Sequence, residues 1–115
     1  MGSWRTHARW GAFAWGVVAA LEATVAYLSA ALPPERLSIV FAASAVVSLV
    51  ATVLLAQAPS AGVLLAATAW AGLNLVLGVW AMPEGAQDLS VPFGLLVGAA
   101  GLLSYLAWRG RRDEA

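Results

Sequence analysis

Four apolar runs separated by short polar or proline-containing segments dominate the pattern of this chain. They cover residues 11–32, 37–56, 61–81 and 91–108. Each run has about 20 residues, or roughly 30 Å as an α-helix, which matches the thickness of the hydrocarbon core of a bilayer. We therefore predict an all-α fold: one integral membrane domain over residues 1–115, built as a four-helix transmembrane bundle.

The segments between the runs contain residues that end or begin helices. Pro33-Pro34 follows the first run and removes two backbone donors, so a turn is predicted there. Ser60 precedes the third run and is expected to be its N-cap. The segment 82–90, with Pro83, is predicted to be the loop that leads into the last run.

The composition agrees with a membrane protein. Apolar residues make up 62% of the chain and charged residues 10%, with a mean hydropathy of +0.83. Soluble domains have an apolar share nearer half and a charged share nearer a quarter. All charged residues except Glu22 lie outside the four runs.

The arginines predict an orientation. Residues 1–10 and 109–115, expected to be a short polar arm and a frayed tail, carry Arg5, Arg9, Arg109, Arg111 and Arg112. The loops on the other side of the membrane carry a single arginine, Arg36. Because positive charge stays on the cytoplasmic side, both termini are predicted to be inside, in the inner (plasma) membrane of a bacterium.

Several classes of function are not expected. The chain has no cysteine and a single histidine, His7, in the polar N-terminal segment, which argues against metal, haem and triad chemistry. It has no phosphate-binding loop, metalloprotease motif or nucleophile elbow. The basic residues at 109–112 are too few for nucleic-acid binding and indicate a headgroup anchor. We therefore predict no enzyme activity, no cofactor and no nucleic-acid partner.

Glu22, in the middle of the first run, is the main candidate for chemistry. An ionisable group at bilayer depth costs a few kcal/mol or more, so it indicates function by default. One interpretation is a structural carboxyl that is protonated or bonded to a neighbouring hydroxyl. The other is a carboxyl beside a cavity, which binds a proton or a cation. Ala19, Ala26 and Ser29 share its helix face and leave room beside the acid.

Two residues of the third run are further candidates for a proton or substrate site. Asn74 is the only amide there, and it can bond another helix or contact a substrate. Trp70, one turn earlier, can pack in the core or stack on a cationic ligand.

Small residues indicate close helix contacts. Ser44, Ser48 and Thr52 share one face of the second helix at intervals of four. A stripe of glycines in the last run predicts a packing or oligomer seam, within the chain or between copies; it consists of Gly94, Gly98 and Gly101.

The two halves of the chain also show a weak internal similarity. The segment 37–41 resembles 89–93, and the segment 12–15 resembles 67–70. These matches indicate two helical hairpins related as parallel repeats, although chance matches are common in apolar helices.

The chain resembles the small multidrug resistance family over most of its length. The similar features are Ala20-Leu21-Glu22 in the first helix, Arg36-Leu37 before the second, Trp70-Ala71-Gly72 in the third, and Gly94 and Gly101 in the fourth. This resemblance implies proton-coupled export of hydrophobic or guanidinium-type cations by a homodimer. It also implies that Glu22 binds proton and substrate in turn while Trp70 lines the cavity. The lysine and tyrosine of that family have no counterpart, because alanines such as Ala30 and Ala67 stand near those positions.

A shorter segment, 74–80, is similar to the helix motif of SPW-repeat membrane proteins, which also pair two helical hairpins. The Ser-Pro-Trp sequence of that family is absent, and the resemblance implies no activity. Two functions therefore remain open. One is a small transporter of cations that works as an oligomer. The other is a non-catalytic accessory or assembly subunit of a larger membrane complex. Both predict the lipid bilayer and further membrane chains as partners.

Overall fold

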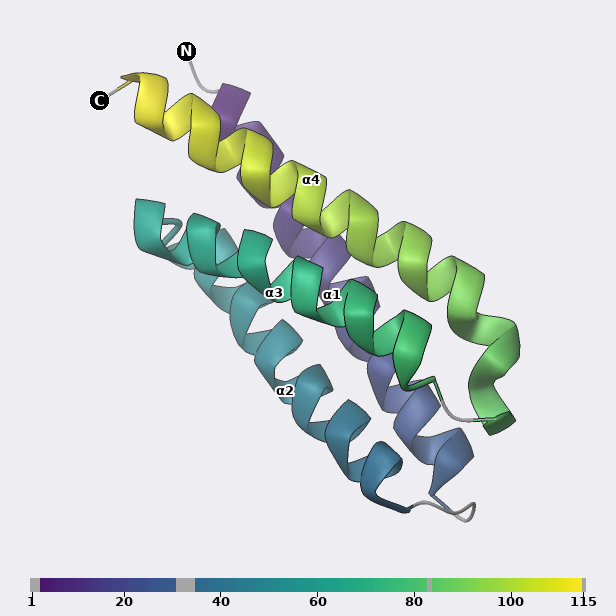
Figure 1. The fold of residues 1–115 in the computed structure, drawn as a ribbon. Helices are drawn as coiled ribbons and strands as arrows, with labels where there is room; N and C mark the ends of the chain where they lie inside the picture. The colour runs from purple at the N-terminus through teal and green to yellow at the C-terminus, as the bar shows by residue number, and fades with distance from the viewer. Residues whose placement is uncertain (1–2, 31–34, 83, 115) are drawn as a thin grey trace.

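The computed structural model describes residues 3–30, 35–82 and 84–114, which form a bundle of long helices (Figure 1). The helices are α1 (Ser3–Ser29), α2 (Glu35–Gln57), α3 (Ala61–Trp80) and α4 (Ser90–Glu114), with a short 3-10 helix, η1 (Glu84–Leu89), before α4. Ser60 is the N-cap of α3, and its side chain accepts a hydrogen bond from the backbone N–H of Val63.

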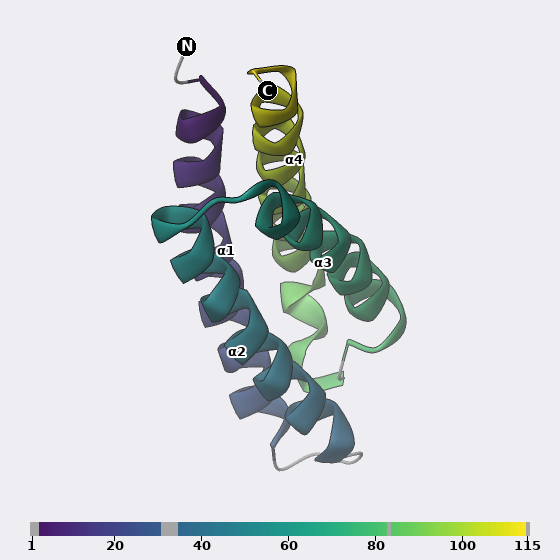
Figure 2. The same cartoon turned by 90° about the vertical axis from the view of Figure 1, so that its left-hand side faces the viewer.

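Successive long helices run antiparallel, so both ends of the chain and the α2–α3 connection lie at one end of the bundle (Figure 1). We call this the terminal end and the other the opposite end. The bundle measures 48 × 21 × 17 Å. Helix α1 is central, because it packs along both α2 and α4, while α4 also packs along α3. By contrast, α2 and α3 make few contacts and diverge from their short connection (Figure 2).

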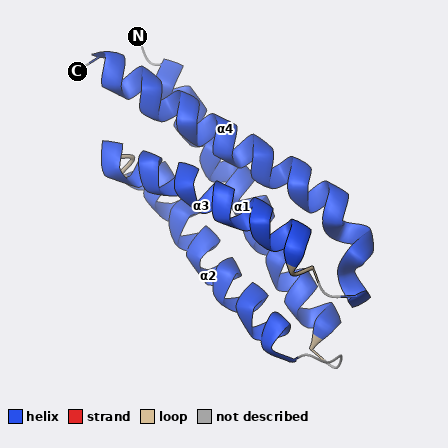
Figure 3. Cartoon of the chain, viewed as in Figure 1, coloured by secondary structure: helices blue, strands red, loops and turns tan. Residues whose placement is uncertain are grey.

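The described residues are almost entirely helical and include no strand, which confirms the predicted all-α four-helix fold (Figure 3). The turn predicted at Pro33-Pro34 and the residue Pro83 lie outside the described residues. Most of the segment predicted as the 82–90 loop forms η1.

The two ends of the chain differ from the prediction. Helix α1 begins at Ser3 rather than at residue 11, and α4 continues to Glu114 instead of fraying after residue 108. The reason is a contact between the two ends: Trp4 is only 3% exposed. It packs on Gly110, where an added Cβ would lie 2.8 Å from the Trp4 Cβ. Burial of this indole extends both helices beyond the apolar runs.

All four long helices are long and apolar enough to cross a membrane. Half of the most apolar stretch of α1 is buried inside the bundle, whereas 22–28% of the corresponding stretch is buried in each of the other three helices. Large apolar side chains on the outer faces are exposed, among them Val46, Leu73 and Leu95. Water-soluble monomers rarely expose such continuous apolar surface, whereas lipid tails solvate it. The four helices therefore fit an integral membrane protein.

Exposed aromatic side chains lie near both ends of the bundle. Trp10 is 59% exposed near the terminal end, while Tyr27 and Trp80 are 82% and 83% exposed near the opposite end. Along α1, the 17 residues from Trp10 to Tyr27 span about 26 Å. Tyr and Trp prefer the membrane–water interface, so these rings fit the two edges of the hydrocarbon layer.

The glycines of α3 and α4 allow these helices to approach closely. A Cβ on Gly101 would lie 2.6 Å from the Cβ of Ala71, and a Cβ on Gly78 would lie 2.7 Å from the Phe93 ring. A side chain at either position would push α3 and α4 apart. Both contacts are made within the chain, so Gly101 belongs to the internal packing.

The other two glycines of the predicted seam have open surroundings. No atom outside the local backbone lies within 4 Å of an added Cβ at Gly94 or Gly98. The predicted stripe is therefore divided, with Gly101 inside the bundle and the other two on its surface. This pair leaves space for a lipid chain or another helix.

Three contacts relate the two hairpins to each other. The rings of Phe41 and Phe93, which occupy matching positions in the predicted repeats, are both buried with centroids 6.0 Å apart. Trp15 in α1 donates to Ser104 in α4, and Trp70 in α3 donates to Ser48 in α2. The first helix of each hairpin thus bonds the second helix of the other. The separation of α2 from α3 breaks this symmetry, and a duplication stays a prediction.

Candidate functional site

Glu22 is fully buried in α1 and bonded to the neighbouring helix. Its exposed fraction is 0%. The hydroxyl of Ser48 in α2 donates to Glu22 Oε1 over 2.5 Å. The same hydroxyl accepts a hydrogen bond from Trp70 Nε1 in α3 over 3.0 Å. One serine hydroxyl thus connects the carboxyl to the indole, and the connection joins three helices.

The helix faces explain why these side chains meet. Glu22 lies on the face of α1 that also carries the buried Val18, Val25 and Ser29. Ser48 lies in the middle of the hydroxyl face predicted for α2. A serine hydroxyl has one proton to donate and lone pairs to accept with. Because Ser48 gives its proton to the carboxyl, it is free to accept the indole N–H, and both bonds form together.

Two buried oxygens of the site have no hydrogen-bond donor. Within the described part of the chain, the buried side-chain atoms without a partner are Glu22 Oε2 and Asn74 Oδ1. Asn74 is 1% exposed, and its Nδ2 donates to the backbone carbonyl of Trp70 over 2.9 Å. Trp70 therefore links the two residues: it is connected to Glu22 through the Ser48 hydroxyl and to Asn74 through its own backbone carbonyl.

The chemistry of these two oxygens indicates what the site accepts. Both are acceptors, so they cannot satisfy each other, and a buried acceptor without a donor costs about 1–3 kcal/mol. A proton on Glu22, a water molecule or a small cation would supply the missing hydrogen-bond donor or positive charge. The arrangement therefore fits a group that brings a hydrogen-bond donor or a positive charge.

Glu22 is closer to one membrane edge than to the other. It precedes Tyr27 by five residues, which is roughly 7.5 Å along α1, and follows Trp10 by twelve residues, or about 18 Å. Along α1, Glu22 is therefore nearer to the exposed ring of Tyr27 at the opposite end than to that of Trp10.

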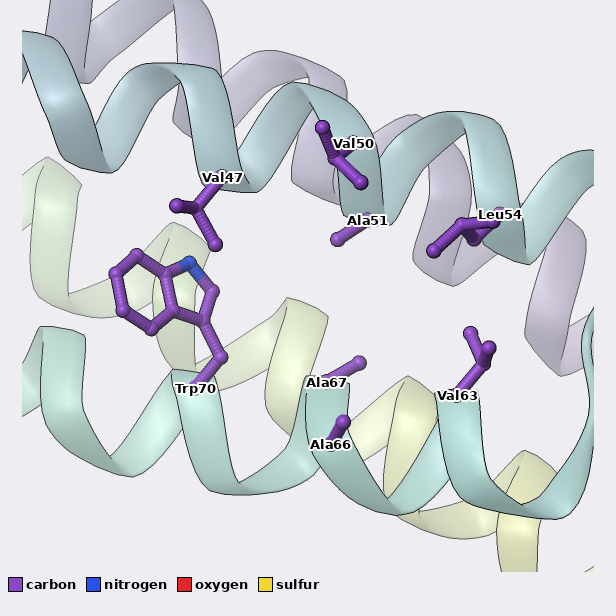
Figure 4. A pocket seen from close by; sticks show the side chains of 8 residues that line it. All are labelled: Val47, Val50, Ala51, Leu54, Val63, Ala66, Ala67 and Trp70. Atoms are coloured by element: carbon purple, nitrogen blue, oxygen red, sulfur yellow. The ribbon is translucent and has the colours of Figure 1, made fainter.

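An apolar groove lies next to the site, between the diverging helices α2 and α3. Its volume is 160 Å³, and Figure 4 shows the side chains that line it: Val47, Val50, Ala51, Leu54, Val63, Ala66, Ala67 and Trp70. The indole of Trp70 forms one end of this groove while its N–H bonds Ser48. The same indole thus lines the groove and bonds Ser48, the hydrogen-bond partner of Glu22.

The space expected beside Glu22 is on a different surface. Ala19 and Ala26 are each 8% exposed and pack within the bundle. Ala19 also lines a shallow groove of 340 Å³ on the outer face of α1 and α2, and Glu22 does not line it. The carboxyl itself faces Ser48 rather than an open cavity.

Sequence reasoning missed the two hydrogen bonds from indoles to serines. The hydroxyl face of α2 was a signal for Ser48, but nothing local indicated that Glu22 and Trp70 would both meet it. Trp15, fully buried, donates to Ser104 over 3.1 Å in a similar way. In the described residues, no group of histidine, cysteine or acidic side chains is arranged to hold a metal ion.

No family model matched the chain, and neither did any curated protein or solved structure. The resemblance to small multidrug resistance proteins therefore stays a hypothesis that depends on the residues quoted for it. The geometry of Glu22, Ser48, Trp70 and Asn74 is the basis of the functional proposal.

Proposed function

We propose that this chain is a small membrane transporter in which Glu22 exchanges a proton for a hydrophobic cation. The observation that carries this proposal is the buried Glu22 carboxyl, whose Oε2 has no donor. A carboxyl removed from water must be neutralised by a proton or by a cation. Exchange of one for the other couples the movement of a cation to that of a proton.

The groove between α2 and α3 supports a hydrophobic cation rather than a guanidinium-type one. Its lining offers aliphatic side chains and one indole, with few polar atoms to bond a guanidinium. An indole face attracts a cation with roughly 0.5 to 2 kcal/mol. A cation dissolved in the lipid enters this groove from the side and reaches the ring of Trp70 first.

Trp70 serves as the gate in this proposal. In the closed arrangement its N–H bonds Ser48, and Glu22 is sealed. Rotation of the indole breaks this one bond and opens a path from the groove to the carboxyl. The weak contact between α2 and α3 makes this pair of helices the place where the bundle opens most easily.

Association and orientation belong to the same proposal. We place both termini in the cytoplasm of a bacterium, because five of the six arginines lie at the terminal end. We expect a homo-oligomer, because the bundle is only 21 × 17 Å across and offers little interior volume. The open surface at Gly94 and Gly98 fits a second helix at close range.

A second candidate function is an accessory subunit of a larger membrane complex. The open glycines of α4 favour it equally, because another protein's helix can fill the same space. Purification in a mild detergent separates the two functions. A homo-oligomer alone supports the transporter, while a stoichiometric foreign membrane protein supports the subunit.

The direct test measures proton flux in vesicles that contain the purified protein, driven by a gradient of a tetraarylphosphonium cation. Wild type is expected to move protons against the cation, and the Glu22→Gln variant is expected to lose this flux. Asp88→Asn is the matched control, because Asp88 is an exposed acid on η1. Absence of flux in wild type, or equal flux in Glu22→Gln, contradicts the proposal.

A further inference from the structure

A second polar site lies at the terminal end, where arginines from two helices meet around Trp4. The Cζ atom of Arg5 in α1 is 4.7 Å from the centroid of the Trp4 ring. The Cζ atom of Arg111 in α4 is 5.1 Å from the same centroid. Two guanidinium groups from opposite ends of the chain thus lie on one indole.

The position of this indole is fixed by packing. Trp4 is 3% exposed, and its Cβ lies against Gly110 of α4, where an added Cβ would be 2.8 Å away. Neither helix can shift here without losing this contact. The helix segments that carry Arg5 and Arg111 are therefore held side by side at this contact.

In the part of the chain that the structure describes, the two guanidinium groups at this point have no carboxylate partner. Arg5 and Arg111 contact the ring of Trp4. No carboxylate among the described side chains forms an ion pair with either of them. Like charges held at one ring repel each other, and a bound anion removes this repulsion. A ligand with negative charge therefore fits this arrangement.

A cavity lies between these arginines and the α2–α3 connection. Its volume is 270 Å³, and Trp4, Arg5, Pro59, Ser60 and Arg111 contribute to its lining. Ser60 is the N-cap of α3, so the positive end of that helix dipole is at the same place.

A smaller cavity of 120 Å³ adjoins it through Arg5 and adds Arg9 and Gln57. Three arginines and a helix N-terminus thus surround one concave region.

We propose that this region binds the phosphate of an anionic phospholipid. Guanidinium groups bind phosphate oxygens through paired hydrogen bonds, which a planar fork provides better than an ammonium. The source is a lipid because the cavity lies at the end of the apolar spans. The interfacial Trp10 directly follows Arg9, lies five residues from Arg5 and is 59% exposed. A lipid whose headgroup enters this cavity can keep its acyl chains along the outer faces of the helices.

The test uses the full chain in detergent, with phosphatidylglycerol as the probe and phosphatidylcholine as the neutral comparison. Native mass spectrometry counts bound lipid, and the midpoint of thermal unfolding reports the same binding independently. Phosphatidylglycerol is expected to bind and to raise the midpoint, while phosphatidylcholine does neither. Loss of one charged hydrogen-bond partner is expected to weaken binding about tenfold or more in Arg5→Gln and Arg111→Gln.

Arg112→Gln is the matched control. It removes the same charge from the same end of α4, but the guanidinium of Arg112 lies over Trp108, with Cζ 5.4 Å from that ring, and does not line the cavity. Its binding of phosphatidylglycerol should stay within twofold of wild type, roughly 0.4 kcal/mol. Arg5→Lys keeps the charge without the fork and should bind more weakly than wild type but better than Arg5→Gln.

Three results would overturn the proposal. Equal binding of the two lipids excludes charge recognition. Equal loss in Arg112→Gln and in Arg5→Gln shows a diffuse basic surface instead of a site. Displacement of the lipid by millimolar sodium phosphate, with the same rise in the unfolding midpoint, assigns the cavity to free phosphate. A variant that unfolds before lipid is added is recognised by its own midpoint, and Arg5→Lys then carries the comparison.

Discussion

Replacement of Ser48 by alanine tests the connection between Glu22 and the other helices. The substitution removes one oxygen and with it two interhelical hydrogen bonds, of 2.5 Å to Glu22 and 3.0 Å from Trp70. Interhelical hydrogen bonds in membranes contribute about 0.6 kcal/mol on average and up to about 1.7, so two such bonds give about 1–3 kcal/mol. The lower end is about a fivefold and the upper end a more than hundredfold change in the unfolding equilibrium, on the order of tenfold per 1.4 kcal/mol.

The assay is reversible unfolding in mixed detergent micelles, followed by far-UV circular dichroism. Ser44→Ala is the matched control, because Ser44 lies one turn earlier on the same face, is 5% exposed and does not bond Glu22. Ser44→Ala is expected to lower the free energy of unfolding by less than about 0.5 kcal/mol. A Ser48→Ala variant as stable as Ser44→Ala would refute the assignment of Ser48 as the link.

A double-mutant cycle with Trp70→Phe isolates one of the two bonds. Phenylalanine keeps an aromatic ring in the groove but removes the N–H that Ser48 accepts. The expected coupling energy between the two substitutions is about 0.6–1.7 kcal/mol. A coupling of zero would show that the indole and the hydroxyl act independently, and Trp70 would then lose its role as a gate held by Ser48.

Five further substitutions test other parts of the structure. Gly101→Ala places a Cβ only 2.6 Å from a facing atom of α3 and is expected to destabilise by about 1–3 kcal/mol. Gly98→Ala, with open space, should be neutral or stabilise by up to about 1 kcal/mol in the same unfolding assay; equal costs contradict the division of the glycine stripe. Asn74→Leu should change stability by less than about 1 kcal/mol, since the lost Nδ2 bond is offset by removal of a buried oxygen without a donor; a larger loss shows an additional partner for Oδ1. The chain has no cysteine, so Gln87→Cys should react with an impermeant maleimide in intact cells and Ser60→Cys only after permeabilisation; the reverse pattern inverts the proposed orientation.

The divergence of α2 and α3 leaves an apolar groove beside Trp70. Trp70 lines the groove between these helices and donates a hydrogen bond to Ser48, which in turn bonds Glu22. A side chain moves faster and at lower cost than a helix, so we propose that rotation of the Trp70 indole controls access to the carboxyl.

The apolar pattern was sufficient to predict the fold. Four runs of bilayer length specify four helices, and the short segments between them make the neighbours antiparallel. The pattern was less informative at the ends. A buried stripe at intervals of four residues is formed by Trp4, Ala8 and Ala12. The arginines between them, Arg5 and Arg9, lower the mean hydropathy of this segment, so it was predicted to be a polar arm. Helical spacing, rather than average polarity, contained the signal that α1 begins at Ser3.

The candidate site was predictable only in part, for a physical reason. A lone acid in an apolar run stands out because burial of a charge is expensive, so Glu22 was identified from the sequence. Its partner depends on how the helices are rotated and shifted relative to one another. Contacts such as Gly101 on Ala71 and Phe41 on Phe93 set that register, and they join residues far apart in the chain. Apolar helices offer many registers of similar composition, so Ser48 could not be chosen over Ser44 in advance.

Proton release on cation binding tests the central claim most directly. Purified protein in a weakly buffered detergent solution is mixed with the tetraarylphosphonium cation, and the released protons are counted with a pH indicator. We expect about one proton per chain for wild type and for the Asp88→Asn control, and none for Glu22→Gln. Binding of the cation without proton release, or equal release from Glu22→Gln, would contradict the exchange at Glu22.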